Sequence, residues 1–147
     1  MIILKYTTGI FVFLTSMYVF SQDCTLDIGG GGNTEQLTSV FQLSTKQLTA
    51  LDSLQGVYTL KEKALQQEIE LLLEKHPQST PKELTILAEK FGVLEQRLLE
   101  LSRTTDQQFL QNFNTKQYQR YLELCKEAIR KPIVVTPVVF KDSISPK

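Results

Sequence analysis

The stretch LSTKQLTALDSLQGVYTLKEKALQQEIELLLEK, residues 43–75, carries the strongest structural signal in the chain. It opens with Ser44, a good helix N-cap, and Gln47 stands three residues later, which is the pattern of a capping box. Apolar residues then recur every seven positions in two neighbouring columns: Leu51, Tyr58, Leu65 and Leu72, and beside them Ala50, Val57, Ala64 and Leu71. The pattern predicts one long amphipathic helix that ends near Lys75 and buries both columns as a broad stripe.

A second long helix is predicted after the turn HPQSTP. Thr80 is its N-cap, Pro81 takes the first helical position and Glu83 completes another capping box. Apolar residues again recur at seven positions, as Leu84, Phe91 and Leu98, and as Leu87, Leu94 and Leu101. Because the connecting turn is short, the two long helices are expected to be antiparallel neighbours.

Two shorter helices flank this pair. Asn33 is a candidate N-cap of a short helix with Leu37, Val40 and Phe41 on one side, and Asn114 with Gln117 forms a third capping box. We expect the last helix to continue until Pro132 stops it. The chain is therefore predicted to be all-α, an elongated helical hairpin of three to four helices.

Composition excludes several functional classes. The 147 residues leave room for one small domain, and 16 basic residues balance 16 acidic ones, so no overall field favours nucleic acid. A single histidine rules out a multi-histidine metal site, and the many serines and threonines have no base partner. We therefore predict no enzyme, no catalytic or metal-binding residue and no cofactor.

The amino terminus resembles an export signal. Residues 1–21 place one positive charge, Lys5, before a mostly apolar stretch, and no acidic residue precedes Asp23. We expect cleavage after Ser21 or one residue later, no stable membrane span, and a periplasmic or secreted protein. The alternative is a lipoprotein signal that uses Cys24, although Asp23 then stands where a small residue is required.

Beyond the signal, the chain divides into three parts. Residues 22–42 are expected to form a glycine-rich, linker-like lead-in and a short helix, and residues 43–131 the hairpin domain. Residues 132–147 form an extended C-terminal tail, whose valine-rich part at 133–140 is interpreted as a flexible tail or as an arm that docks onto a partner. Export makes Cys24 and Cys125 a plausible disulfide; two unpaired thiols are the alternative.

The helix starts LSTKQ at 43–47 and FNTKQ at 113–117 resemble the repeated motif of the LTXXQ-motif family of periplasmic proteins (Spy/CpxP-like). The positions that match the motif are Leu43, Ser44 and Gln47 in the first copy, and Phe113, Asn114 and Gln117 in the second. The resemblance implies a helical hairpin that pairs into a cradle-shaped dimer. It also implies an ATP-independent chaperone, an inhibitor of an envelope stress kinase or a metal sensor. The balanced charge departs from the basic concave face of chaperone members, and His76 is alone as a ligand of the metal-responsive kind.

The leading hypothesis is an exported envelope protein that binds unfolded or partly folded proteins through an apolar helical face. Candidate client contacts are Tyr58, Phe91, Phe109, Phe113 and Tyr121, for which packing in the core is the competing interpretation. The alternatives are a sensory or regulatory envelope-stress protein that docks a membrane-bound partner through residues 133–140, and a structural accessory protein without a client.

Overall fold

The computed structural model describes residues 22–29 and 33–138. The expected signal peptide at 1–21 and the end of the tail, residues 139–147, lie outside the described residues. The described chain is all-α, as predicted, with helices α2 (Thr34–Phe41), α3 (Thr45–Lys75), α4 (Pro81–Leu110) and α5 (Thr115–Glu127). Two very short strands, β1 (Asp23–Cys24) and β2 (Lys131–Pro132), pair in parallel.

The helix starts follow the capping residues. Asn33, Ser44, Thr80 and Asn114 are the N-caps, and all three predicted capping boxes are formed. Each cap side chain accepts hydrogen bonds from the first-turn N–H groups that have no partner inside the helix. Local chemistry therefore sets where each helix begins.

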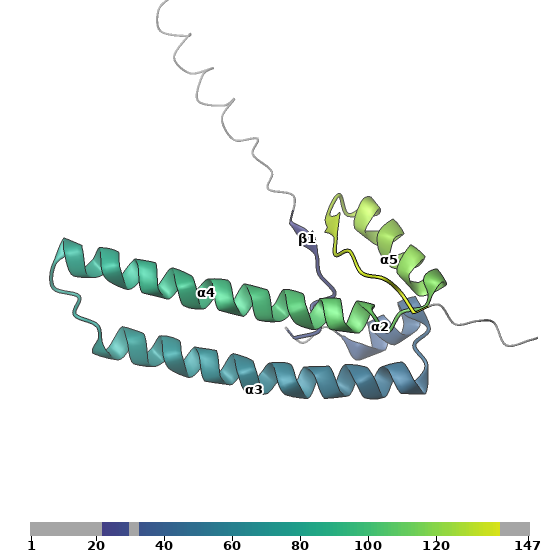
Figure 1. The fold of residues 1–147 in the computed structure, drawn as a ribbon, viewed down its shortest axis with the longest axis horizontal. Coiled ribbons are helices and arrows are strands. Elements are labelled where there is room, and N and C mark those ends of the chain that lie inside the picture. Colours follow the sequence, from purple (N-terminus) through teal and green to yellow (C-terminus); the bar gives the residue numbers. More distant parts are fainter. Residues whose placement is uncertain (1–21, 30–32, 139–147) are drawn as a thin grey trace, which may run out of the picture.

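The two long helices form an antiparallel hairpin, and the remaining elements gather at one end of it, where α3 begins and α4 ends (Figure 1). We call this end the base. Its core is a single cluster of buried side chains: Cys24, Ile28, Leu37, Phe41, Leu43, Leu51, Phe109, Leu110, Phe113, Tyr121, Cys125 and Ile133. We call the rest of the hairpin, residues 59–101, the arms.

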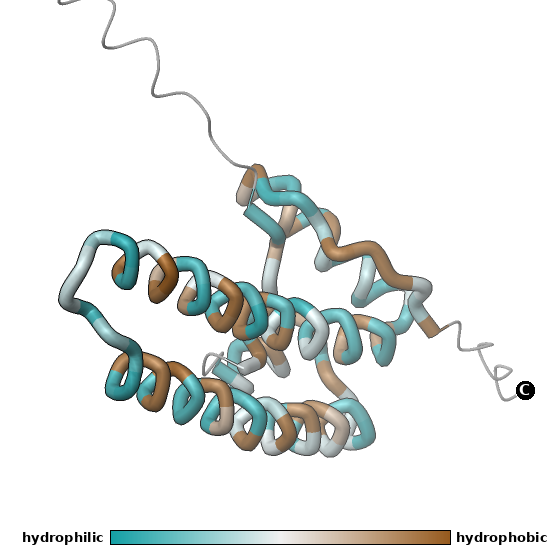
Figure 2. Tube along the Cα trace, turned by 60° about the vertical axis from the view of Figure 1, so that its left-hand side comes forward, coloured by the Kyte–Doolittle hydropathy of each residue, from teal (hydrophilic) through white to brown (hydrophobic). Residues whose placement is uncertain are grey.

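The arms are two helices thick and have little core of their own. Their buried side chains are Leu65, Leu87 and Leu94, which belong to the predicted seven-residue columns. Apolar residues recur along both long helices, drawn in brown in Figure 2. The prediction that both columns of α3 are buried is wrong, because a single partner helix covers only one of them. Val57 and Leu71, from the second column, are exposed.

The last helix ends earlier than predicted. It ends at Glu127, well before Pro132, because Ile129 adopts a left-handed conformation with φ of 54°. The N–H of Arg130 donates to the carbonyl of Cys125 at 2.9 Å, and the N–H of Ile129 donates to that of Lys126 at 3.1 Å. These two bonds form a Schellman-type helix end, in which Ile129 occupies the left-handed position that glycine usually takes.

The lead-in and the start of the tail are packed rather than free, which corrects the prediction of a linker and of a flexible tail. Ile28 and Ile133 are both buried in the base cluster, and β1 pairs with β2. Further along, the N–H of Val138 donates to the carbonyl of Phe113 at 2.9 Å. The two chain segments flanking the helices therefore complete the base.

Candidate functional site

The two motif copies meet at the base through their glutamines. Gln47 Nε2 donates to Gln117 Oε1 at 2.8 Å, and Gln117 Nε2 donates back to Gln47 Oε1 at 3.1 Å. Each Oε1 also accepts the N–H of its own cap, Ser44 at 3.0 Å and Asn114 at 2.9 Å. Each Nε2 further donates to a carbonyl that precedes the opposite motif, that of Asn112 and that of Phe41. Gln47 and Gln117 thus hold the starts of α3 and α5 together through hydrogen bonds.

The apolar motif residues are part of the same base. Leu43 and Phe113 are buried, and the Phe113 ring lies against those of Phe41 and Phe109, with centroid separations of 4.8 and 5.4 Å. Buried side chains in a single cluster stabilise a fold. We conclude that the motif positions are structural in this chain.

Most of the aromatic residues proposed as client contacts are not on the surface. Tyr58, Phe109, Phe113 and Tyr121 are buried, and only Phe91 remains partly exposed. The prediction that these four side chains form an accessible binding surface is therefore wrong. Phe109, Phe113 and Tyr121 are part of the base cluster, and the ring of Tyr58 lies against Gly29.

An apolar surface does exist, on one face of the hairpin, and its α3 residues were predicted to be buried. We call it the open face, and it consists of Val57, Ala64, Leu71, Ile86 and Val93. The side chains of Val57 and Leu71 are 49% and 52% exposed, and that of Val93 is 61% exposed. Two shallow depressions of about 420 and 460 Å³ lie along this face.

Charged side chains are interleaved with the apolar ones there. Lys61, Glu68, Lys90, Arg97 and Glu100 line the two depressions. Arg97 and Glu68 form an ion pair across the two helices at 2.6 Å, and both are about half exposed. An exposed pair of this kind contributes little to stability. The open face is therefore a mixed surface, apolar in patches and charged between them.

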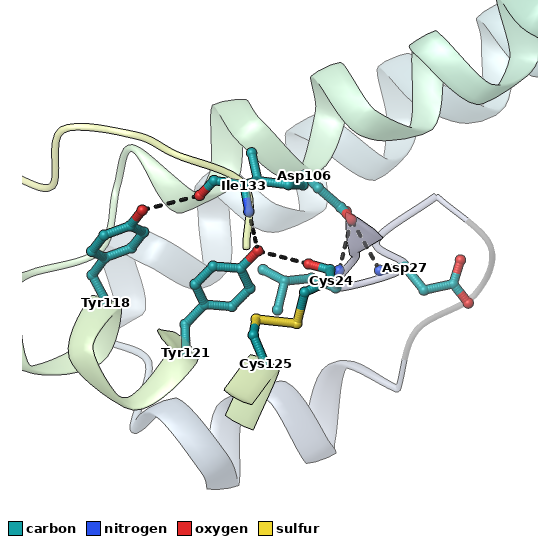
Figure 3. The surroundings of a disulfide bond; sticks show 8 residues. Cys24, Asp27, Asp106, Tyr118, Tyr121, Cys125 and Ile133 are labelled. Atoms are coloured by element: carbon teal, nitrogen blue, oxygen red, sulfur yellow. Dashed lines mark hydrogen bonds between the residues drawn. A yellow bond between two sulfur atoms is a disulfide. The ribbon is translucent and has the colours of Figure 1, made fainter. Parts of the chain in front are cut away.

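The most elaborate polar site lies at the base, around a segment that we call the strap, residues 23–28 (Figure 3). The strap begins with β1 and then turns at Asp27, whose φ of 55° is left-handed. The carboxylate of Asp106, at the end of α4, accepts the backbone N–H groups of Leu26, Asp27 and Ile28 at 2.6, 3.2 and 3.2 Å. Burial raises the pKa of this carboxyl above its ordinary value, although the three backbone donors act in the opposite direction.

Two tyrosines hold the strap and the chain after α5. The Tyr121 hydroxyl donates to the carbonyl of Cys24 at 2.7 Å and accepts the N–H of Ile133 at 2.8 Å. The Tyr118 hydroxyl donates to the carbonyl of Ile133 at 3.0 Å and accepts the N–H of Val135 at 3.2 Å. Burial raises the pKa of Tyr121 to about 12. Both phenols therefore act as hydrogen-bonding connectors.

The two cysteines are bonded to each other. The Sγ atoms of Cys24 and Cys125 are 2.08 Å apart, which ties the strap to α5 across 101 positions of sequence. Both cysteines are buried, and Cys24 also lines an open cavity of about 620 Å³ beside α2 and α5. The disulfide thus joins the first and last parts of the base.

Over residues 22–29 and 33–138, no group of three or more His, Cys, Asp or Glu side chains could hold a metal ion. None of the helices described is both long and apolar enough to cross a bilayer.

Fold and site together define an all-α, disulfide-closed helical hairpin with a packed base and thin arms. Comparisons with protein-family models, with curated proteins and with solved structures find no match for this chain.

Sequence reasoning missed the strap site and misplaced the apolar surface. Asp106 lies in TTDQQ, a stretch in which nothing distinguishes it from an exposed helix residue. Its partners are backbone groups 78 to 80 residues earlier, and backbone groups leave no trace in a sequence. The exposed column of α3 was visible as a pattern, but which column meets α4 depends on how the helices are oriented.

Proposed function

We propose that this chain is an exported protein that binds unfolded or partly folded proteins through the open face of its hairpin, without ATP. The proposal rests on the apolar side chains that the open face exposes to solvent. Leu71 and Val93 lie exposed beside each other along one depression, with Val57 and Ile86 extending the surface in both helices. Exposed apolar patches on small proteins commonly mark sites of interaction.

The composition of the face suits brief and unselective contact. Its depressions are shallow, so an apolar segment of a client would lose only part of its water-exposed area on binding. The charged residues between the patches keep their hydration and limit how much surface a client can cover. Affinity is then low at each patch, and release is fast.

Export and family membership belong to the same proposal. The signal-like residues 1–21 support export, and a disulfide suits an oxidising compartment such as the periplasm. The resemblance to the LTXXQ-motif family is supported by the way Gln47 and Gln117 pair. The reciprocal hydrogen bonds join the two motif copies to each other at the starts of α3 and α5.

The resemblance also implies a homodimer, which we include in the proposal. A second copy would find its apolar contacts on the arms, where side chains from both helices remain exposed. Sedimentation velocity on the chain beginning at Gln22 measures the oligomeric state. A monomer at all concentrations would remove the dimer from the proposal and leave the whole open face to clients.

Light scattering from an aggregating denatured protein, at near-equimolar ratio and without ATP, tests the function. We expect the chain to suppress scattering. In the triple variant Val57→Ser, Leu71→Ser, Val93→Ser, the reduction in scattering should be at least threefold smaller, because the variant lacks the apolar patches. These three side chains are about half exposed, so the variant should remain folded.

A matched control uses three leucines that are exposed to similar degrees on other sides of the same helices. Leu73→Ser, Leu84→Ser, Leu99→Ser removes as much exposed apolar surface but leaves the open face intact. Equal loss of suppression in both variants would contradict a specific role of the open face. No suppression by the unaltered, folded chain would contradict the chaperone function itself and favour a regulatory or structural protein.

A further inference from the structure

The chain that follows β2 is extended, and we call residues 133–138 the edge segment. Burial alternates along it: Ile133 is buried and Val135 is partly buried, whereas Val134 and Thr136 are exposed. A period of two residues is that of a β-strand, and no residue of the edge segment has a positive φ. Figure 1 shows the segment in yellow, leading from β2 back along α5.

One edge of this segment is already occupied. The N–H of Ile133 donates to the Tyr121 hydroxyl, which in turn donates to the carbonyl of Cys24, so a phenol bridges the segment to β1 (Figure 3). The Tyr118 hydroxyl accepts the N–H of Val135 and donates to the carbonyl of Ile133. The backbone groups of Ile133 and Val135 therefore face the two tyrosines.

The opposite edge of the segment is open. Successive residues of a strand direct their backbone groups to opposite edges, so the N–H and carbonyl groups of Val134 and Thr136 face away from the tyrosines. Within residues 22–29 and 33–138, no hydrogen bond involves these backbone groups. Pro137, which has no N–H, belongs with the odd-numbered residues and leaves this edge intact. Two donors and two acceptors are thus presented as at the edge of a sheet.

The exposed side chains of the edge segment suit the addition of a strand. Val134 is 79% exposed and Val138 is 44% exposed, with Thr136 between them. All three are β-branched, the kind of side chain that packs well across paired strands. The open edge therefore favours an extended partner that is itself rich in β-branched residues.

Positive charge gathers at the start of the open edge. Arg130 and Lys131 directly precede the segment, and both are exposed. Neither forms an ion pair within the described chain, since Asp23, which lies opposite Lys131 in the sheet, contacts Arg103 instead, at 3.5 Å. In an antiparallel pair, the carboxyl end of an added strand lies beside these two cations, which attract acidic residues there. A second copy of this segment offers no acidic side chain over residues 133–140.

We propose that the open edge is a docking site for a partner protein, which adds an extended segment as an antiparallel strand beside residues 133–138. The partner's segment carries β-branched side chains and ends in acidic residues. Its main chain bonds to the N–H and carbonyl groups of Val134 and Thr136, and its acidic end meets Arg130 and Lys131. The site lies on the base and does not depend on the function proposed for the open face.

Fluorescence polarisation with a labelled peptide tests this docking site. The probe is fluorescein-labelled TVTVTVDD, and the receptor is the oxidised chain beginning at Gln22. We expect saturable binding. Replacing both aspartates of the probe with lysines should weaken binding at least about tenfold, because like charges then meet Arg130 and Lys131. Absence of saturable binding by the folded chain would overturn the proposal.

N-methylated probes separate strand addition from adhesion to an apolar surface. Methylation of alternate amides removes the donors along one edge of the probe and leaves every side chain in place. Methylation of the intervening amides removes the donors along its other edge. One pattern should weaken binding at least about tenfold and the other less than about threefold, because only one edge bonds to the protein. Equal effects of the two patterns would contradict strand addition.

Variants of the protein locate the edge that is used. Val134→Pro removes a donor at an exposed position, whereas Val134→Thr keeps the N–H and the β-branched shape. The proline variant should bind the probe at least about tenfold more weakly, and the threonine variant less than about threefold more weakly. The variant Val57→Ser, Leu71→Ser, Val93→Ser should bind it as the unaltered chain does. Unchanged binding by folded Val134→Pro, or loss of binding in the open-face variant, would reject this site.

Sedimentation velocity on the same proteins identifies the other occupant that the edge could take. The unaltered chain and Val134→Pro should sediment alike at every concentration, because a partner protein and not a second copy fills the edge. If the unaltered chain formed dimers under conditions in which Val134→Pro stayed monomeric, the edge would belong to a second copy. That result would overturn the assignment to a partner.

Discussion

Gln47 and Gln117 illustrate how single residues in this protein serve two structural purposes at once. Each closes the capping box of its own helix and each donates to the other across the base. Their amide groups are buried, and no buried side-chain nitrogen or oxygen among the described residues lacks a hydrogen-bond partner. Removing one glutamine therefore leaves several groups unsatisfied rather than one.

We expect Gln47→Ala and Gln117→Ala each to lower the free energy of unfolding by about 2 kcal/mol, the order expected for unpaired buried polar groups. The double variant should lose about 1 kcal/mol less than the two singles together, because the same pair is broken only once. Urea unfolding followed by circular dichroism measures all three. Gln66→Ala, at an exposed position of α3, is the control and should have little effect. Strict additivity would mean that the two glutamines are not coupled.

Tyr121 makes stability depend on pH in the alkaline range. Burial raises its pKa from 10.0 to about 12, so the unfolded chain loses this proton at lower pH than the folded chain does. The free energy of unfolding should therefore fall between about pH 10 and 12, by at most about 3 kcal/mol from this group. Tyr121→Phe should be less stable at neutral pH, since two hydrogen bonds are lost, and should show a shallower decline. Parallel declines in the two proteins would contradict this assignment.

At the scale of single residues, the caps were predictable and their distant partners were not. Ser44 and Asn114 are recognisable because capping depends on neighbours three positions away. The bond between Gln47 and Gln117 spans 70 positions, and the sequence contains nothing that requires it. The same holds for Asp106, whose partners are backbone groups.

At the scale of elements, the seven-residue repeat of apolar side chains defines the two long helices, but the neighbouring elements cover only part of their apolar surface. The column through Leu65 is buried, and the neighbouring column through Leu71 is exposed, because α4 covers one side of α3 and no other element of the described chain reaches the arms. Periodicity predicted the helices themselves. It could not say how wide a stripe the fold would cover, because that depends on how many neighbours each helix has.

Two glycines inside the long helices offer a way to strengthen them. A Cβ atom added at Gly56 or at Gly92 would meet nothing within 4 Å beyond its chain neighbours and the backbone of its own helix. Gly56→Ala and Gly92→Ala should each raise the free energy of unfolding by about 0.5 to 1 kcal/mol, since alanine restricts the unfolded chain and favours the helix. Thermal unfolding measures the gain. At Gly29 the same substitution would overlap the ring of Tyr58, so Gly29→Ala should destabilise the protein. A destabilised Gly56→Ala would indicate that the helix needs the glycine.

At the scale of the whole molecule, the base and the arms differ in how they are held together. The base has the main hydrophobic cluster, the disulfide and the strap, whereas the arms rely on Leu65, Leu87 and Leu94. The general architecture followed from the sequence. The division into a packed base and thin arms did not, because the lead-in and the tail resembled connectors and are instead packed against the core.

Hydrogen exchange should resolve this division in the oxidised protein. Amides in the arms, residues 59–101, should exchange at least tenfold faster than those around Leu51, Phe109 and Phe113, because regions with few buried apolar contacts open locally at a lower free energy. Exchange monitored by NMR gives the rates residue by residue. A uniform rate along α3 and α4 would show that the hairpin opens only as a unit with the base.

The disulfide also has a mechanical consequence. It joins Cys24 to Cys125, 101 positions apart in the sequence, and so closes the chain between them into a covalent ring. A tensile force applied between the two ends passes through one covalent bond and bypasses the long helices entirely. Stretched in this way, the oxidised molecule lengthens only by the segments outside the ring, and the hairpin remains unloaded.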